Sequence, residues 1–299
     1  MDSDQSSNHA KLVIQKLLKQ TQESSESDQN KKISTPEARV LCVTSGKGGT
    51  GKSILTYNIG FHFAQKGYQV TILDADMGLG NIHSLSGSSL NYDLVDLIHG
   101  RMDLDDVILE TDFGFSLISG GKSEELANFT YHDFRKLTDY LEPLKSTNDL
   151  ILVDTASSLS LQTTAFLHTL NEIIVVVPPD PTAIPATLTI IRSILQSNRS
   201  ALIGLIVNQV PKKRIAKEVF SEINQICILE LNKKLIDYGQ VRTDSNIGLS
   251  VTQQQPLQLL TPNSRACRDI SWTTDRIEWV GRQQSNRLTL PPNLQPTWL

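Results

Sequence analysis

The stretch TSGKGGTGKS, residues 44–53, decides the fold of this chain of 299 residues. It follows a short apolar run, Val40–Val43, and precedes a segment with helical spacing of apolar residues. Residues 46–53 fit the pattern GxxxxGK followed by Ser or Thr, in which backbone N–H groups and a helix N-terminus face a phosphate. The same glycines also fit GxGxxG, but a dinucleotide loop has no use for the Lys-Ser pair. The stretch therefore predicts a phosphate-binding loop between a strand and a helix.

The side chains of this loop have the types that a nucleoside triphosphate with Mg²⁺ requires. Lys52 is expected to reach the β- and γ-phosphates, and the hydroxyl of Ser53 is expected to ligate Mg²⁺. A nucleoside triphosphate and Mg²⁺ are therefore the ligands that the loop predicts. The loop residues predicted to contact the nucleotide are Gly46, Lys47, Gly48, Gly49, Thr50, Gly51, Lys52 and Ser53.

Carboxylates follow two further apolar runs. Asp74 and Asp76 come after Val70–Leu73, and Asp154 comes after Leu150–Val153. Carboxylates two residues apart after a strand point to the same side, where a phosphate-bound metal and an attacking water are expected. Four apolar residues that end in Asp form the pattern that holds Mg²⁺ in phosphate-loop proteins. Each acid alone could be a helix cap or a solvated group, but together with the loop the pattern predicts that Ser53 and Asp154 hold Mg²⁺.

The rest of the chain alternates short apolar runs with helical patterns. Runs of β-branched and apolar residues without polar alternation are typical of strands that are covered on both faces. Such alternation predicts right-handed crossovers and a doubly wound, mainly parallel α/β sheet. The predicted strands are Val40–Val43, Val70–Leu73, Phe115–Ile118, Leu150–Val153, Ile173–Val177 and Leu202–Val207. The helical patterns are Ile54–Ala64, the set Phe134, Leu137, Leu141 and Leu144, Leu188–Leu195, and Ile215–Ile226.

Composition excludes several other classes of protein. Lys and Arg total 28 and Asp and Glu total 32, so the net charge of −4 argues against strong attraction to nucleic acid. The three cysteines form no CxxC pair, which argues against a disulfide framework, a zinc ribbon or a cysteine-ligated cluster within one chain. No run approaches the roughly 18 apolar residues of a membrane span, and residues 1–20 lack a signal-peptide pattern. A cytoplasmic protein is expected, with possible peripheral placement at the inner face of the membrane or at a cell pole.

Composition also predicts the domain organisation. Residues 1–20 are expected to form an amphipathic helix, residues 21–38 a disordered linker, residues 39–282 the P-loop domain, and residues 283–299 an irregular Pro-rich tail. The N-terminal helix could be a frayed terminal helix or a docking helix for a partner, and the sequence leaves both open. Arg265–Arg282 has a narrow apolar face and mixed charge, which favours a packed helix over a membrane-binding one.

The form KGGTGKS, with Lys47 five residues before Lys52, resembles the deviant Walker A motif of the MinD/ParA class of P-loop ATPases. The resemblance implies a slow, partner-stimulated hydrolysis of ATP to ADP and phosphate. It also implies an ATP-sandwiched homodimer in which Lys47 reaches the partner subunit's nucleotide. Within this class the second acid polarises the hydrolytic water, so the implied catalytic residues are Lys47, Lys52 and Asp76, while Asp74 supports the metal.

The segment after Asp154 departs from the pattern of the class. Relatives usually carry a glycine in a D-x-x-x-G pattern, which brings a backbone N–H close to the γ-phosphate. Here Ser157 and Ser158 occupy this segment. Serine can donate its backbone N–H, but it does not readily adopt a positive φ. We therefore expect nucleotide binding to survive, while the γ-phosphate switch and the hydrolysis rate are put in doubt.

Two further strand ends fit a nucleoside site. Pro179 and Asp180 follow the fifth predicted strand, and Asn208 follows the sixth. An amide can pair with both the amino group and a ring nitrogen of adenine. The resemblance implies this role for Asn208, although an Asx turn is the alternative that the residue type alone allows.

Within the class, DADMGLGNIHSLSG (residues 74–87) and PPDPTAIPATLTII (residues 178–191) resemble the FlhG group of flagellar-number regulators, also called FleN or YlxH. The resemblance implies an ATP-dependent switch that controls flagellar number, placement or assembly. Implied partners are a flagellar basal-body protein or a transcription regulator. An FlhF-like, signal-recognition-type GTPase is a further implied partner through the N-terminal helix, whose match to the group's motif is partial.

Two alternatives stay open beside this reading. A ParA-like positioner of cargo on DNA is suggested by the basic cluster of Lys212, Lys213, Arg214 and Lys217, which is usually a solvated face. An ATP-binding scaffold with little hydrolysis is suggested by Ser157 and Ser158. With the overall negative charge and the mixed C-terminal helix, DNA binding is not expected and membrane binding is expected to be weak.

Overall fold

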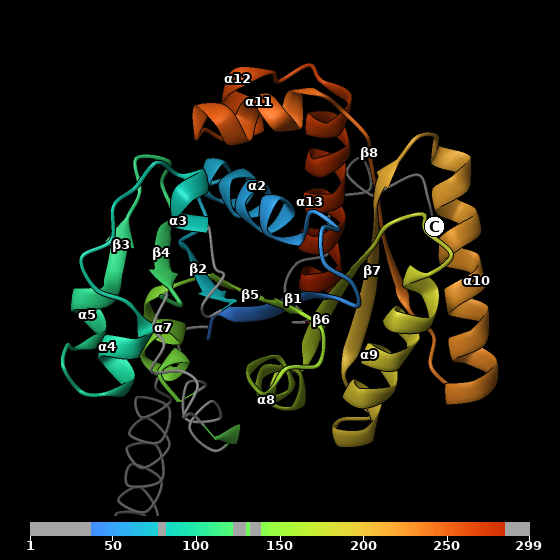
Figure 1. Ribbon diagram of the computed structural model, residues 1–299, viewed down its shortest axis with the longest axis horizontal. Helices are drawn as coiled ribbons and strands as arrows, with labels where there is room; N and C mark the ends of the chain where they lie inside the picture. The colour runs from blue at the N-terminus through green and yellow to red at the C-terminus, as the bar shows by residue number, and fades with distance from the viewer. Residues whose placement is uncertain (1–36, 77–81, 122–129, 132–138, 285–299) are drawn as a thin grey trace, which may run out of the picture. The chain divides into compact units, whose positions relative to one another are not determined.

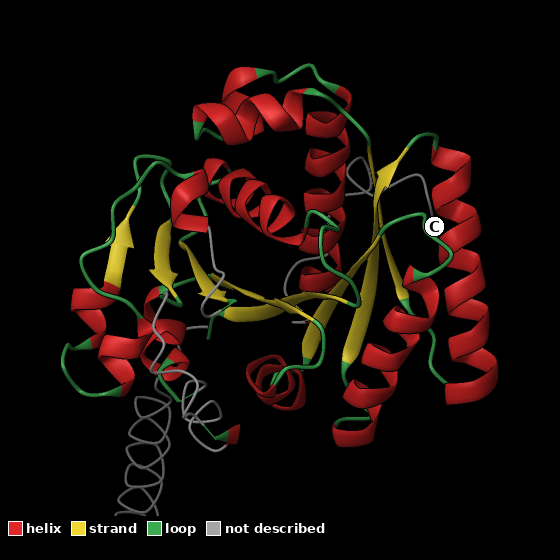
Figure 2. Cartoon of the chain, in the orientation of Figure 1, coloured by secondary structure: helices red, strands yellow, loops and turns green. Residues whose placement is uncertain are grey.

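The computed structural model describes residues 37–76, 82–121, 130–131 and 139–284, and its compact unit begins at Ala38. Its strands form an eight-stranded sheet in the order β3-β4-β2-β5-β1-β6-β7-β8. Every neighbouring pair is parallel except β3 and β4, which are antiparallel (Figure 2). The strands are β1 (Arg39–Ser45), β2 (Val70–Ala75), β3 (Ile108–Glu110), β4 (Ser116–Ser119), β5 (Leu150–Ser157), β6 (Glu172–Val177), β7 (Leu202–Val210) and β8 (Ile236–Arg242).

This topology confirms the predicted doubly wound, mainly parallel sheet. The six predicted strands correspond to β1, β2, β4, β5, β6 and β7. Strands β3 and β8, which lie at the two edges of the sheet, were not predicted from the sequence. In β8 the residues IDYGQVR alternate polar and apolar types, so no continuous apolar run marks the strand. An edge strand is covered less completely, and its sequence therefore carries a weaker signal.

Helices cover both faces of the sheet. In Figure 1, α2 and α13 lie on one face, and α8, α9 and α10 lie on the other. The predicted helical patterns after Ser53, after Ala183 and after Lys213 are confirmed as α2, α9 and α10, whereas Phe134 and Leu137 lie outside the described residues. The helices are α2 (Lys52–Gln65), α3 (Ile82–Leu85), α4 (Leu94–Ile98), α5 (Leu104–Val107), α7 (Leu141–Thr147), α8 (Leu161–Thr169), α9 (Ala183–Ser197), α10 (Lys213–Leu231), α11 (Asn246–Gln253), α12 (Leu257–Leu260) and α13 (Arg265–Gln284).

The strand residues alternate between two hydrophobic cores. Leu41 and Val43 of β1 pack with the residues of α2 and α13, whereas Cys42 between them packs with α8, α9 and α10. In β5, Leu152 joins the first core and Val153 the second. All five side chains are at most 1 % exposed, so both faces of the central strands are buried. This double burial explains why these strands read as unbroken apolar runs.

The C-terminal helix α13 packs against the sheet, as its narrow apolar face predicts. Ala266, Ile270 and Ile277 are buried in the core on the α2 side of the sheet. Arg39 of β1 donates to the carbonyl of Ile277 at 2.6 Å, which ties the helix to the central strand. Among the described residues, no helix is long and apolar enough to cross a membrane. The predicted N-terminal helix and the Pro-rich tail lie outside the described residues.

Candidate nucleotide site

The predicted site residues lie at the carboxyl ends of five neighbouring strands. In the sheet order β2-β5-β1-β6-β7, the chain leaves β1 in one direction to β2 and in the other direction through β6 to β7. Such a switch point leaves a crevice at the carboxyl ends of the strands, where ligands bind in open α/β sheets. The loop after β1 lies at this point, and the residues that follow β2, β5, β6 and β7 surround it.

Two glycines shape the loop after β1. Gly51 is the N-cap of α2 and has φ 81, a left-handed conformation that other residues adopt only with strain. A Cβ at Gly51 would lie 2.5 Å from the side-chain nitrogen of Asn208. A Cβ at Gly46 would lie 2.6 Å from the backbone of Ala186 in the first turn of α9. Glycine is therefore required at both positions, once for the turn into the helix and once for close packing against α9.

Lys52 and Asp154 form a buried ion pair at the end of β5. Their charged atoms are 2.9 Å apart, and their side chains are 6 % and 0 % exposed. Ser53 donates its hydroxyl to Asp154 at 2.6 Å, and Thr56 donates to the other carboxylate oxygen at 2.9 Å. Each oxygen of Asp154 thus has a partner, which offsets the cost of burying its charge. Lys52, Ser53 and Asp154, chosen from sequence spacing, are brought together.

Asp74 and Asp76 lie at the end of the neighbouring strand β2. Asp74 is opposite Asp154 in the parallel register and is fully buried. Its carboxylate accepts hydrogen bonds from the backbone N–H of Ile82 at 3.0 Å and of Asp76 at 3.3 Å. Burial, followed by repulsion from Asp154, raises the pKa of Asp74 to about 7. Asp76 is half-buried, and burial also raises its pKa.

Lys47 has a different environment from that of Lys52. Its ammonium nitrogen lies 2.5 Å from Asp180 Oδ2 and 3.0 Å from Thr182 Oγ1, and the Lys47 side chain is 47 % exposed. The hydrogen bonds from Lys47 and Thr182 lower the pKa of Asp180 to about 2. The loop after β6 therefore binds Lys47 of the phosphate loop within the same chain. Pro179, the residue before Asp180, is half-buried in that loop.

Asn208 at the end of β7 has an unsatisfied acceptor. Its side chain is 3 % exposed, and its amide nitrogen donates to the carbonyl of Thr50 at 2.6 Å. Its Oδ1 is buried and has no hydrogen-bond partner among the described residues. Gln209 follows with φ 59 and donates to the carbonyl of Gly49 at 2.9 Å. A buried acceptor without a partner is costly, and the exocyclic amino group of adenine is a donor that would satisfy it.

The donor set also fits Mg²⁺ in a nucleotide complex. Mg²⁺ is bound in such sites by one or two carboxylates, a hydroxyl and the substrate phosphates, and it retains several waters. Ser53 and Asp154 supply the hydroxyl and one carboxylate in direct contact with each other, and Asp74 supplies a second carboxylate on the neighbouring strand. Among the described residues, no group of three or more His, Cys, Asp or Glu side chains could hold a metal without further ligands. These residues therefore suit a metal that the phosphates help to hold.

Ser158 occupies the position where the class usually has glycine, and it takes the backbone conformation of a glycine. Its φ is 118, outside the regions that serine populates readily. Its backbone N–H donates to the carbonyl of Ser45 at 3.3 Å, which joins the end of β5 to the end of β1. The serine at this position is therefore held in a strained backbone conformation.

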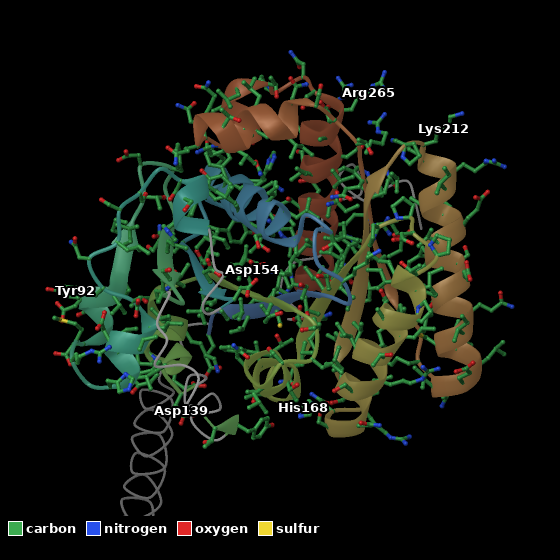
Figure 3. All side chains as sticks on the ribbon, in the orientation of Figure 1. Tyr92, Asp139, Asp154, His168, Lys212 and Arg265 are labelled. Atoms are coloured by element: carbon green, nitrogen blue, oxygen red, sulfur yellow. The ribbon has the colours of Figure 1, made fainter. Side chains whose placement is uncertain are left out.

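Three polar residues that hydrogen-bond to predicted site residues were not themselves predicted from the sequence. Thr56 lies one helical turn after Lys52, so its place on the same face of α2 could have been inferred from spacing. Thr182 and Gln209 have no such signal, because only the folded loops bring them to Lys47 and Gly49. The basic cluster lies at the start of α10, where Figure 3 labels Lys212. All four of its residues, Lys212, Lys213, Arg214 and Lys217, are exposed.

Known proteins share both the sequence and the fold. The family model for an AAA domain matches residues 38–206. The flagellum site-determining protein YlxH of Helicobacter pylori is 27 % identical to this chain over 260 residues, which cover 85 % of each chain. The antiactivator FleN of Pseudomonas aeruginosa is 25 % identical over 229 residues, which cover 76 % of this chain and 82 % of FleN.

Solved structures of cell-division proteins have the same fold. The septum site-determining protein MinD of Pyrococcus horikoshii, solved with Mg-ADP, matches with a TM-score of 0.69 and 21 % identity. The match covers 82 % of this chain and 97 % of that one. The MinC:MinD cell division complex of Aquifex aeolicus contains a chain that matches with a TM-score of 0.67 and 22 % identity, covering 85 % of this chain and 98 % of that one.

Proposed function

Because this chain belongs to the AAA domain family and to its MinD/ParA class of P-loop ATPases, we propose that it is an ATP-dependent dimerisation switch of the FlhG type. The chain is a MinD-like ATPase, and its relatives YlxH and FleN are a flagellum site-determining protein and an antiactivator. The proposed role is control of flagellar number, placement or assembly. Hydrolysis is proposed to be slow and to be stimulated by a partner.

The observation that carries the dimerisation proposal is the exposure of Lys47 in the phosphate loop. Lys52 is buried against Asp154, so one lysine already serves the chain's own phosphate site. Lys47 leaves the same loop with almost half of its side chain exposed. A lysine placed in this way can supply positive charge to a phosphate bound by a second copy of the chain. Two such loops facing each other would enclose two ATP molecules and exclude water.

Hydrolysis needs an oriented water and neutralisation of the charge that develops on the phosphates. In the proposed mechanism Asp76 orients the water that attacks the γ-phosphorus, and ADP leaves. Lys52 and the partner's Lys47 neutralise the developing charge. Ser53, Asp154 and Asp74 would hold Mg²⁺, which would supply further neutralisation of the negative charge. A raised pKa at Asp76 is consistent with a group that can accept the proton of the water.

The nucleoside end of the proposed site is formed by loops on the other side of β1. Asn208 is proposed to pair with adenine, supported by its unsatisfied buried Oδ1. Pro179 and Asp180 are proposed to line the same end. The proposed partners are a flagellar basal-body protein or a transcription regulator, with an FlhF-like GTPase at residues 1–20. The proposed place of action is the cytoplasm, including the inner face of the membrane or the cell pole.

The first test is the molar mass in solution, measured by light scattering with Mg·ATP and with Mg·ADP. A dimer with ATP and a monomer with ADP are expected for the natural chain. Lys47→Ala should remain a monomer with both nucleotides while still binding ATP, because Lys52 remains. A monomer in all conditions would contradict the dimerisation proposal.

A second test separates the switch from a binding scaffold with little hydrolysis, which the strain at Ser158 favours. Asp76→Ala should keep the ATP-bound dimer and lose phosphate release, because the water is no longer oriented. If Asp76→Ala releases phosphate at the rate of the natural chain, Asp76 does not orient the water. If the natural chain itself releases no phosphate, the scaffold function replaces the switch.

A further inference from the structure

Lys47 is held on its own chain by a small network at the start of α9. The ammonium donates to Asp180 Oδ2 at 2.5 Å and to Thr182 Oγ1 at 3.0 Å. The hydroxyl of Thr182 donates in turn to Asp180 Oδ1 at 2.9 Å. Three polar groups therefore close a ring in which each donor has an acceptor. Both acceptors come from the loop between β6 and α9.

The two oxygens of Asp180 have separate tasks. Oδ1 accepts from the backbone N–H of Thr182 at 2.9 Å and from the Thr182 hydroxyl, so it organises the turn into α9. Oδ2 accepts from Lys47. Prolines at positions 178, 179 and 181 restrict the backbone on both sides of the aspartate. The turn thus orients the Asp180 carboxylate independently of its contact with Lys47.

The start of α9 is an unfavourable place for a cation unless a carboxylate is present. A Cβ at Gly46 would lie 2.6 Å from Ala186, so the phosphate loop is pressed against the first turn of this helix. A helix N-terminus carries partial positive charge, which repels an ammonium group. The negative charge of Asp180 offsets this repulsion and stabilises the Lys47 ammonium group near the start of α9. Without Asp180, the lysine would have no ionic partner on its own chain among the contacts that the structure gives it.

We propose that Asp180 is a positioning residue that holds Lys47 on its own chain until the nucleotide phosphates of a second copy displace it. The inference rests on the proposed dimerisation, in which Lys47 must leave its resting position. Asp180 then sets how much protein is needed to form the ATP-bound dimer. This role is separate from the proposed place of Asp180 at the nucleoside end, because it acts on Lys47 and not on the phosphates.

The exposure of the pair makes this hold reversible. The side chains of Lys47 and Asp180 are 47 % and 36 % exposed. Ion pairs with this exposure are weak and are screened by salt. A triphosphate carries several negative charges and can replace one carboxylate as the partner of the lysine. Removal of the hold should therefore favour the dimer by about two- to fivefold for each Lys47, and the factor applies twice because the dimer contains two copies of the pair.

The test uses Asp180→Asn, because asparagine keeps an oxygen that can accept from Thr182 but cannot form the ion pair. The matched control is Glu230→Gln, which removes the same charge from an exposed pair with Arg192. Dimer formation is followed by sedimentation over a range of protein concentrations, with saturating Mg·AMP-PNP. Asp180→Asn should halve the midpoint concentration or lower it further, and Glu230→Gln should leave it unchanged. A midpoint that is unchanged or raised in Asp180→Asn overturns the proposal.

A second measurement tests the hold without a dimer. The nucleotide-free chain is treated briefly with acetic anhydride, and acetylation of Lys47 is quantified by mass spectrometry. Lys47 should be acetylated faster in Asp180→Asn than in the natural chain or in Glu230→Gln. Equal rates in all three overturn the proposal. If Lys47 is released in Asp180→Asn but the natural chain never dimerises, the proposed function fails while the hold itself stands.

Discussion

Two lysines of one loop, five residues apart, have opposite environments. Lys52 lies 2.9 Å from Asp154, and the two side chains are 6 % and 0 % exposed. Lys47 lies 2.5 Å from Asp180, and the two side chains are 47 % and 36 % exposed. In Figure 3, Asp154 is labelled beside the strands below α2. Both pairs join a lysine to an aspartate at a strand's carboxyl end, so the difference between them is burial.

Burial determines whether such a pair is permanent or exchangeable. Breaking a buried pair leaves a charge without solvent or partner, whereas water replaces either partner of an exposed pair. Ser53 and Thr56 strengthen the buried pair by donating to Asp154. The exposed pair can be given up when another anion is offered. One loop thus contains a fixed part of a phosphate site and a part that can change partner.

The largest effect is expected from Asp154→Asn. This substitution removes the carboxylate that is paired directly with the buried Lys52 ammonium, and loss of one partner of a buried pair costs about 3–5 kcal/mol. The midpoint of urea unfolding should fall accordingly, and binding of a fluorescent ATP analogue with Mg²⁺ should be lost. Lys47→Ala, which removes the exposed pair, is the matched control and should leave the unfolding midpoint unchanged. Equal midpoints for the two variants would show that burial does not distinguish the pairs.

A smaller effect should come from protonation of a buried but uncharged group, His62 of α2. Burial lowers its pKa to about 4, nearby Lys66 adds to this, and Asp275 opposes it. In the unfolded chain the pKa of His62 is about 6.5, so the unfolded state binds the proton at a higher pH than the folded state does. Between pH 6.5 and 4 the unfolded state is therefore increasingly favoured as the pH falls. The natural chain should therefore lose about 2 kcal/mol more unfolding free energy between pH 7 and pH 4.5 than His62→Gln does.

The measurement for His62 is urea unfolding at both pH values. If His62→Gln loses as much unfolding free energy on acidification as the natural chain, burial of His62 does not contribute to acid sensitivity.

The smallest effect is expected at Ser158, where the chain leaves the fixed Asp154 site. Its φ of 118 is a strained conformation for serine, and glycine adopts it freely. Ser158→Gly should raise the unfolding free energy by about 0.5–1 kcal/mol, because relief of strain exceeds the added chain entropy. Ser157→Gly, within β5, should instead lower it by about 0.5–1 kcal/mol. A loss of stability in both variants would refute strain at Ser158.

The central part of the fold could be predicted from the sequence because its strands are buried on both faces. Unbroken apolar runs in β1, β2 and β5 to β7 mark such strands. The edge strand β8 is half polar and could not be recognised in this way. The packed C-terminal helix was predicted correctly, because mixed charge on α13 leaves only a narrow apolar face. Lys66, the C-cap residue of α2, pairs with Asp275 and Glu278 of that helix, contacts that no spacing rule predicts.

The candidate site was predictable where it lies within one motif. Lys52 and Ser53 follow from the loop pattern, and Asp154 follows from its place after a buried strand. Their direct contact confirms that these distant segments meet. The pairing of Lys47 with Asp180 could not be predicted, since 133 residues separate them and only the order of β1 and β6 in the sheet brings them together.

The sequence by itself determined the phosphate loop, the parallel sheet and the strand ends at which acids lie. These features could be predicted because a loop motif and a strand buried on both faces each require particular residue types at neighbouring positions in the sequence. The tertiary structure alone decided which lysine is buried and which is partly exposed, because exposure depends on what packs nearby. It also decided that Ser158 takes a glycine conformation and that Asn208 keeps an unsatisfied oxygen. These features arise from contacts between strands and loops that are distant in sequence, so no local pattern encodes them.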